Sequence, residues 1–87
     1  MKKYEIVLQP SIKKQLRKID KKQSERIVIK IYALSIDPYP LDSKKLTNRD
    51  KYSMRVGQYR VLYVVDEGIL KIYVLQTGHR KDVYKKL

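Results

Sequence analysis

The chain has 87 residues, of which 43% are hydrophobic and 34% charged, and its net charge is +12. It is too apolar for a disordered chain, and it has no run of about 18–20 apolar residues that could span a membrane. The absence of cysteine and the single histidine exclude disulfides, thiolate metal sites and a two-histidine nuclease mechanism. We therefore expect a single domain over residues 1–87, located in the cytoplasm, with no metal, no cofactor and no membrane contact.

The positive charge is spread along the whole chain. Residues 1–45 contain twelve bases and five acids, and residues 46–87 contain nine bases and four acids. The charge therefore belongs to the folded surface and is not confined to a detachable basic tail. A folded domain this basic usually binds a polyanion, which can be RNA, DNA or an acidic protein.

The first half of the chain predicts a strand and two helices. Residues 3–8 (KYEIVL) form a short strand, and Pro10-Ser11 opens a helix with Ser11 as its N-cap. Apolar residues recur along this helix at helical spacing, namely Ile12, Leu16 and Ile19. A second helix is predicted over residues 21–35. Because the link near Asp20 is short, the two helices should form an antiparallel hairpin.

The second predicted helix has an apolar stripe that consists of Ile27, Ile31 and Leu34. Val28 and Tyr32 widen this stripe. Asp37-Pro38 ends this helix, because a residue before proline avoids helical geometry. Residues 38–50 show no sustained period and are interpreted as a connecting loop.

The second half of the chain predicts three strands, at residues 51–56, 59–66 and 69–76, followed by a short basic tail. Gly57-Gln58 suits a type II′ turn between the first two strands, and Glu67-Gly68 separates the second pair. The order is β-α-α-β-β-β. This order predicts an α+β domain with the helical hairpin packed on one face of a small curled, mainly antiparallel sheet.

Two-residue loops fix which residues face each other. In the first hairpin Arg55 faces Arg60, while in the second Val65 faces Leu70 and Arg60 faces Leu75. Because strand side chains alternate between faces, one face should form the core under the helices. Its predicted members are Tyr52, Met54, Val56, Val61, Tyr63, Val65, Leu70, Ile72 and Val74.

The opposite face of the predicted sheet gathers cations. Its members are Lys51, Ser53, Arg55, Arg60, Lys71 and Tyr73, with Leu62, Val64 and Leu75 between them. Two arginines directly opposite each other destabilise an isolated sheet by about 0.2–1 kcal/mol, so the pair favours a bound anion. Several cations near an aromatic ring are typical of a nucleic-acid groove, and a solvated face with snorkelling arginines is the alternative.

One reaction suits such a face without metal, namely cleavage of RNA by its own 2′-hydroxyl. The protein must align the nucleophile with the leaving 5′-oxygen, stabilise charge on phosphorus and move two protons. Arginine and lysine supply the charge, and crowded cations lower one another's pKa. His79 is the residue with an ordinary pKa near neutrality, and a loop histidine without a catalytic role explains it equally well.

Two segments resemble RelE-type toxins of the RelE/ParE superfamily. The first is YSMRVGQYRVLY at 52–63, preceded by KKL at 44–46, and the second is GHRKDVY at 78–84. The resemblance covers essentially the whole chain, including the order of its elements. It implies a toxin of a type II toxin–antitoxin module that cuts mRNA in the ribosomal A site and leaves a 2′,3′-cyclic phosphate.

The resemblance also implies residue roles. Arg60 would stabilise the phosphate, Arg80 would act as general acid toward the 5′-oxygen, and Tyr84 would stack on or orient the substrate. Lys51 matches one of two lysines that are candidates for general base and charge stabilisation.

The second of those lysine positions holds Ser53, which is a departure from the family pattern. The identity of the base therefore stays open, and Arg55 or His79 could share its load. We expect a wider group of residues to bind the substrate, namely Ser53, Arg55, Lys71, Tyr73 and Lys81.

The resemblance further implies partners. These are an acidic antitoxin, partly disordered when free, and the 70S ribosome with its mRNA. A +12 surface suits an acidic partner that folds on binding. Two other functions stay open: a ParE-like DNA gyrase inhibitor, against which the retention of Arg60, Arg80 and Tyr84 argues, and a non-catalytic RNA-binding module.

Overall fold

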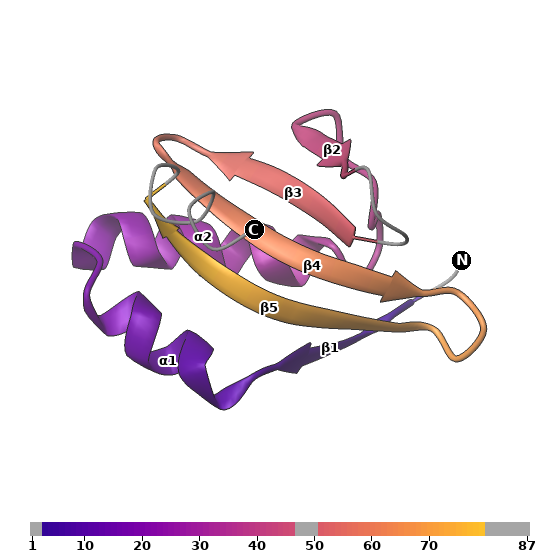
Figure 1. Cartoon of the computed structure of the whole chain (residues 1–87). Helices are drawn as coiled ribbons and strands as arrows, with labels where there is room; N and C mark the ends of the chain where they lie inside the picture. Colours follow the sequence, from indigo (N-terminus) through magenta and orange to yellow (C-terminus); the bar gives the residue numbers. More distant parts are fainter. Residues whose placement is uncertain (1–2, 47–50, 80–87) are drawn as a thin grey trace.

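The computed structural model describes residues 3–46 and 51–79. Its elements are β1 (Glu5–Leu8), α1 (Pro10–Arg17), α2 (Lys21–Ala33), β2 (Ser43–Lys45), β3 (Lys51–Val56), β4 (Tyr59–Asp66) and β5 (Lys71–His79). The strands form one open sheet in the order β1-β5-β4-β3-β2 (Figure 1). β1 pairs with β5 in parallel, and the other pairs are antiparallel. The predicted α+β fold is therefore confirmed, with one strand more than expected.

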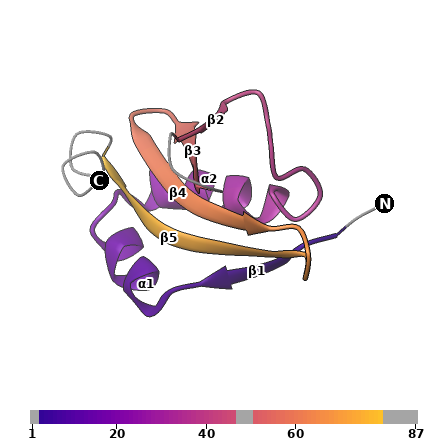
Figure 2. The same cartoon turned by 45° about the vertical axis from the view of Figure 1, so that its right-hand side comes forward.

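Both helices lie on the same side of the sheet (Figures 1 and 2). α1 begins at Pro10 and has Gln9 at its N-cap position, so the prediction of Ser11 as N-cap was wrong. Proline suits the first turn because its fixed φ is helical and its missing N–H needs no partner there. α2 ends at Ala33, slightly before the predicted end.

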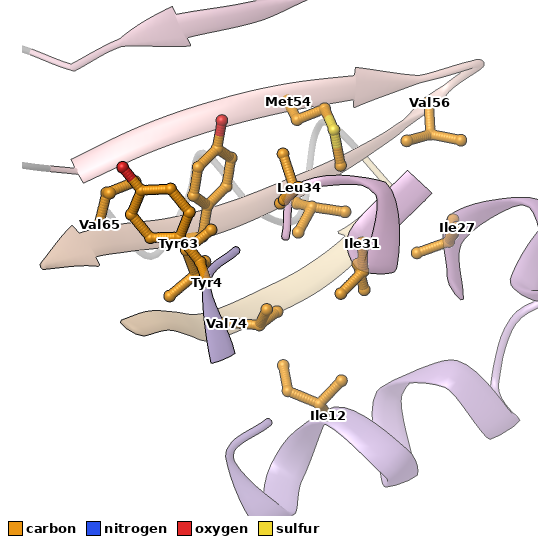
Figure 3. Packing of buried hydrophobic residues seen from close by; sticks show 12 residues of the cluster. Tyr4, Ile12, Ile27, Ile31, Leu34, Met54, Val56, Tyr63, Val65 and Val74 are labelled. Carbon is orange, nitrogen blue, oxygen red and sulfur yellow. The ribbon is translucent and has the colours of Figure 1, made fainter. Parts of the chain in front are cut away.

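The core fills the space between the helices and one face of the sheet. In Figure 3, Ile12 of α1 and Ile31 of α2 approach Val74 of β5, and all three are buried. Both predicted apolar stripes contact this core. The α1 stripe is Ile12, Leu16 and Ile19, and the α2 stripe is Ile27, Ile31 and Leu34. Tyr32 does not widen the α2 stripe, because it is 51% exposed.

The hairpin between β3 and β4 has the predicted register. Arg55 pairs with Arg60 and Tyr52 with Tyr63. Gly57 has φ +62° while Gln58 does not enter the left-handed region, as a type II′ turn requires. The glycine is needed here because a side chain is strained at this φ.

The hairpin between β4 and β5 departs from the predicted register by two residues. Val65 pairs with Ile72 instead of Leu70, because the connection spans residues 67–70. Asp66 Oδ1 accepts hydrogen bonds from the backbone N–H groups of Gly68 and Ile69, and Leu70 adopts a φ of +53°. The aspartate therefore builds a longer turn than Glu67-Gly68 predicts.

A bulge in β5 at Leu75 shifts the register once more. Leu62 pairs with Gln76 and Tyr63 with Val74, so Leu75 has no partner on β4. Arg60 consequently faces Gly78, not Leu75. β5 also continues to His79, three residues beyond its predicted end.

The segment predicted as a loop over residues 38–50 contains β2. Ser43, Lys44 and Lys45 pair with Met54, Ser53 and Tyr52 of β3. A three-residue polar edge strand has too short a pattern to show a period of two.

In the part of the chain that the structure describes, no helix is long and apolar enough to cross a membrane.

Candidate nucleic-acid interface

The sheet face opposite the helices carries the predicted cations. The register places Lys51, Ser53 and Arg55 of β3, Arg60 of β4 and Lys71 and Tyr73 of β5 on this face. We call it the cationic face. Its residues form cross-strand rows, which separate them into two groups.

The first row consists of Arg55, Arg60 and Gly78. Arg55 is exposed, and its Nε donates a hydrogen bond of 3.3 Å to the Gly57 carbonyl. Arg60 is half-buried, and its Nε atom is enclosed. Gly78, the partner of Arg60 on the third strand, adds no side chain to this row.

The next row is closed from solvent. Ser53 and Leu62 lie opposite each other and are 1% and 3% exposed. The Oγ of Ser53 is buried with no hydrogen-bond partner among the described residues. Ser53 therefore offers no exposed group of its own for a substrate.

The second group of predicted residues lies farther along the sheet. Lys51 shares a row with Val64 and Tyr73, four residues along β3 from Arg55, or about 13 Å. Lys71 lies at the far end, opposite Asp66 on β4 and Glu5 on β1. The structure therefore brings Arg55 beside Arg60 and leaves Lys71 between two carboxylates.

His79 lies at the end of β5 on the other face of the sheet. It pairs with Tyr59, and the two rings meet edge to face with centroids 6.0 Å apart. Tyr59 packs against the core under the helices. The structure therefore separates His79 from the face that presents Arg60. The remaining predicted residues, Arg80, Lys81 and Tyr84, lie outside the described residues.

A tyrosine cluster occupies the opposite end of the sheet. Glu67 accepts hydrogen bonds from the hydroxyls of Tyr4 and Tyr39, and the Tyr39 and Tyr52 rings have centroids 5.0 Å apart. The hydrogen bond to Glu67 raises the pKa of Tyr4. Partial burial and the same carboxylate raise the pKa of Tyr39. A cavity of about 380 Å³ opens beside Tyr39, Tyr52 and Tyr73.

Tyr63 links the core to the segment after α2 by a hydrogen bond. Its buried hydroxyl donates a hydrogen bond of 2.7 Å to the Pro38 carbonyl, and its ring stacks on Tyr52. Burial raises the pKa of Tyr63 to about 12. Tyr4, Tyr39 and Tyr63 therefore stay neutral at physiological pH and serve packing and hydrogen bonding.

Two surface features escaped the sequence analysis. Lys44 lies in the row of Ser53, one strand farther out, and is exposed on the cationic face. The exposed apolar side chains of Ile29, Tyr32 and Ile36 follow one another along α2 and just beyond it. The KKL motif was the only sequence signal that included Lys44.

Among residues 3–46 and 51–79, no group of three or more acidic or histidine side chains could hold a metal ion.

Comparison with known proteins decides the family. The model of the ParE toxin of type II toxin–antitoxin systems matches residues 6–84. The chain belongs to this family. The comparison with curated proteins gave no significant match.

Solved structures of RelE/ParE toxins share the fold. The Pyrococcus horikoshii RelE–RelB complex contains a chain 28% identical to this toxin with a TM-score of 0.81, covering 92% of this chain and 97% of that chain. The Mycobacterium tuberculosis RelBE2 complex contains one 25% identical with a TM-score of 0.80, covering 92% and 94%. A YoeB/ParE toxin from Agrobacterium tumefaciens, at 19% identity and a TM-score of 0.72, covers 87% and 98% and shows the fold alone. The protein is thus a toxin of the RelE/ParE superfamily.

Proposed function

We propose that this toxin is a ribosome-dependent mRNA endoribonuclease that cuts mRNA in the A site without metal and thereby inhibits translation. The observation that carries the proposal is the row of Arg55, Arg60 and Gly78. It places two arginines directly opposite each other on neighbouring strands, with a glycine beside Arg60 on the third strand. Two guanidinium groups at facing positions can both donate hydrogen bonds to the oxygens of one phosphodiester.

The proposed reaction is attack of the substrate's own 2′-oxygen on the adjacent phosphorus. The P–O2′ bond forms, the P–O5′ bond breaks, and a 2′,3′-cyclic phosphate remains. Arg60 and Arg55 stabilise the charge that develops on the phosphoryl oxygens. The ribosome holds the mRNA so that the 2′-oxygen lies in line with the leaving group.

Two protons must move in this reaction. We assign protonation of the 5′-oxygen to Arg80 and orientation of the substrate to Tyr84, on the strength of the family resemblance. A protonated guanidinium has no acceptor atom, so Arg55 acts through its charge and not as the general base. Among the residues first considered as base, Lys51 remains the candidate on the cationic face, because His79 lies on the other face.

The proposed partner is an acidic antitoxin. The Pyrococcus and Mycobacterium structures are toxin–antitoxin complexes. On this toxin, Ile29, Tyr32 and Ile36 form an exposed apolar strip next to the basic side chains of α2. An amphipathic helix with acidic flanks would bury the strip and pair with the surrounding charges.

DNA gyrase inhibition is the second candidate, because the matching family model describes a ParE toxin. A gyrase inhibitor has no use for an arginine pair aimed at RNA phosphate. Intact mRNA together with broken DNA would therefore identify that function in place of the nuclease.

The test is a cell-free translation reaction with the purified toxin. Primer extension maps the mRNA 5′ ends with and without ribosomes. We expect cuts within codons only when ribosomes are present. Intact mRNA under both conditions would contradict the proposal, and the same toxin would then be tested in a gyrase supercoiling assay.

A further inference from the structure

The strand β2 extends the cationic face by one strand. Lys44 pairs with Ser53, and the neighbouring row contains Arg55 and Arg60. Residues on the same face of a strand repeat about every 6.6 Å, so Lys44 lies one such step from the arginine row. Its position therefore suits a second anionic group of the same ligand.

The backbone that carries Lys44 is held in place. Arg55 N–H donates to the Asp42 carbonyl at 2.9 Å, and Ser43 Oγ donates to the Pro40 carbonyl at 2.7 Å. The Lys30 ammonium bonds the Asp42 carboxylate at 2.7 Å and links α2 to this segment. β2 is thus a fixed edge strand, and Lys44 is a positioned cation.

The charges around Lys44 leave its ammonium facing solvent. Lys44 is exposed, and Asp42, the acid two residues before it, is engaged by Lys30. Lys45 is equally exposed, but alternation along β2 turns it to the face of Tyr52. The adjacent lysines Lys44 and Lys45 therefore carry the same charge but lie on opposite faces of the sheet.

In the row that contains Lys44 and Ser53, β3 supplies no cation. Ser53 is 1% exposed, and its short side chain ends inside the protein. A lysine side chain at position 44 extends past it toward solvent. The row of Ser53 consequently receives its positive charge from β2.

We propose that Lys44 binds the RNA phosphate next to the one held by Arg55 and Arg60. The single-stranded substrate then crosses the sheet from β4 toward the β2 edge. This inference rests on the proposed function and assigns a substrate-positioning residue to the same site.

The test measures binding of a labelled single-stranded RNA oligonucleotide to the full toxin over a range of salt concentrations. Loss of one phosphate contact reduces the slope of log affinity against log salt by about 0.7. We expect this reduction and a several-fold weaker affinity in Lys44→Ala. Lys45→Ala removes the same charge from the other face and should keep the wild-type slope. Lys44→Arg should restore it.

Equal slopes in Lys44→Ala and Lys45→Ala would overturn the inference. Loss of antitoxin affinity in Lys44→Ala with an unchanged RNA slope would also overturn it, because the residue would then serve the protein partner. Failure of the wild-type toxin to cut mRNA contradicts the proposed function separately, since the slope comparison does not depend on cleavage. Failure of the wild type to bind RNA would overturn the inference but not the proposed function, because the ribosome holds the mRNA during cleavage.

Discussion

Arg60 is the described residue with the most direct role at the proposed phosphate. Its Nε is enclosed, and its cross-strand partners are Arg55 and Gly78. We expect Arg60→Ala to lower the single-turnover rate of ribosome-dependent cleavage by about 10²–10³-fold, as loss of a preorganised charge-stabilising group does. Arg17→Ala, on the exposed side of α1, removes the same charge and should change the rate little. Equal rates in the two variants would contradict the assignment.

The hydrogen bond of the buried Tyr63 hydroxyl contributes to the stability of the core. Tyr63→Phe leaves the buried Pro38 carbonyl without its partner and should cost about 1–3 kcal/mol in the free energy of unfolding. Urea unfolding near neutral pH measures this cost. An unchanged free energy of unfolding would mean that the hydrogen bond contributes nothing.

The raised pKa of Tyr63 adds a pH dependence with a defined sign. The folded pKa of about 12 exceeds the ordinary value of 10, so the native state keeps a proton that the unfolded state loses. The associated stability is fully present below pH 10 and is lost as pH rises toward 12. The free-energy difference between wild type and Tyr63→Phe should therefore shrink over that range, as urea unfolding at each pH would show. A constant difference would contradict the buried-hydroxyl explanation.

At the scale of elements, α2 carries the surface proposed for the antitoxin. Ile29 is 70% exposed, and burying it fully against a partner would contribute about 1.5–3 kcal/mol. Ile29→Asp should weaken antitoxin binding by about 10–100-fold in a calorimetric titration and leave RNA cleavage intact. Ile69→Asp changes an equally apolar exposed residue in the β4–β5 turn, so it serves as the matched control. A larger loss in the control than in Ile29→Asp would place the antitoxin elsewhere.

The two hairpins show what sequence alone predicts about this sheet. A glycine in a two-residue turn fixed the register of β3 and β4 correctly, including the Arg55–Arg60 pair. The turn after Asp66 is longer because that carboxylate binds backbone N–H groups inside it. The resulting shift of two residues preserved which side chains face the core, since strand alternation has a period of two.

The bulge and the edge strand account for most of the remaining differences. One extra residue at Leu75 places Gly78 beside Arg60 and sends His79 to the helix-covered face. No local signal marks that bulge, because it depends on how two strands pack. β2 forms only by pairing with β3, so Lys44 could not be placed on the cationic face from the sequence.

The whole molecule combines a +12 charge with a sheet face opposite the one that α1 and α2 cover. Under the proposed function, long-range attraction raises the rate of encounter with ribosomal RNA, and the arginine row then binds the phosphate that reacts. The same charge attracts an acidic antitoxin to the α2 side. Substrate and antitoxin therefore use different faces in this account, and the antitoxin reaches the active face only by extending around the sheet.

The most direct measurement concerns the nucleophile itself. An mRNA is prepared with a single 2′-deoxynucleotide immediately 5′ of the mapped cut, and its cleavage on ribosomes is compared with that of the all-ribose message. If the cationic face works by promoting attack of the 2′-oxygen, the deoxy message remains intact at that position while the all-ribose message is cut and ends in a 2′,3′-cyclic phosphate. Cleavage of both messages, or of neither, would contradict the account.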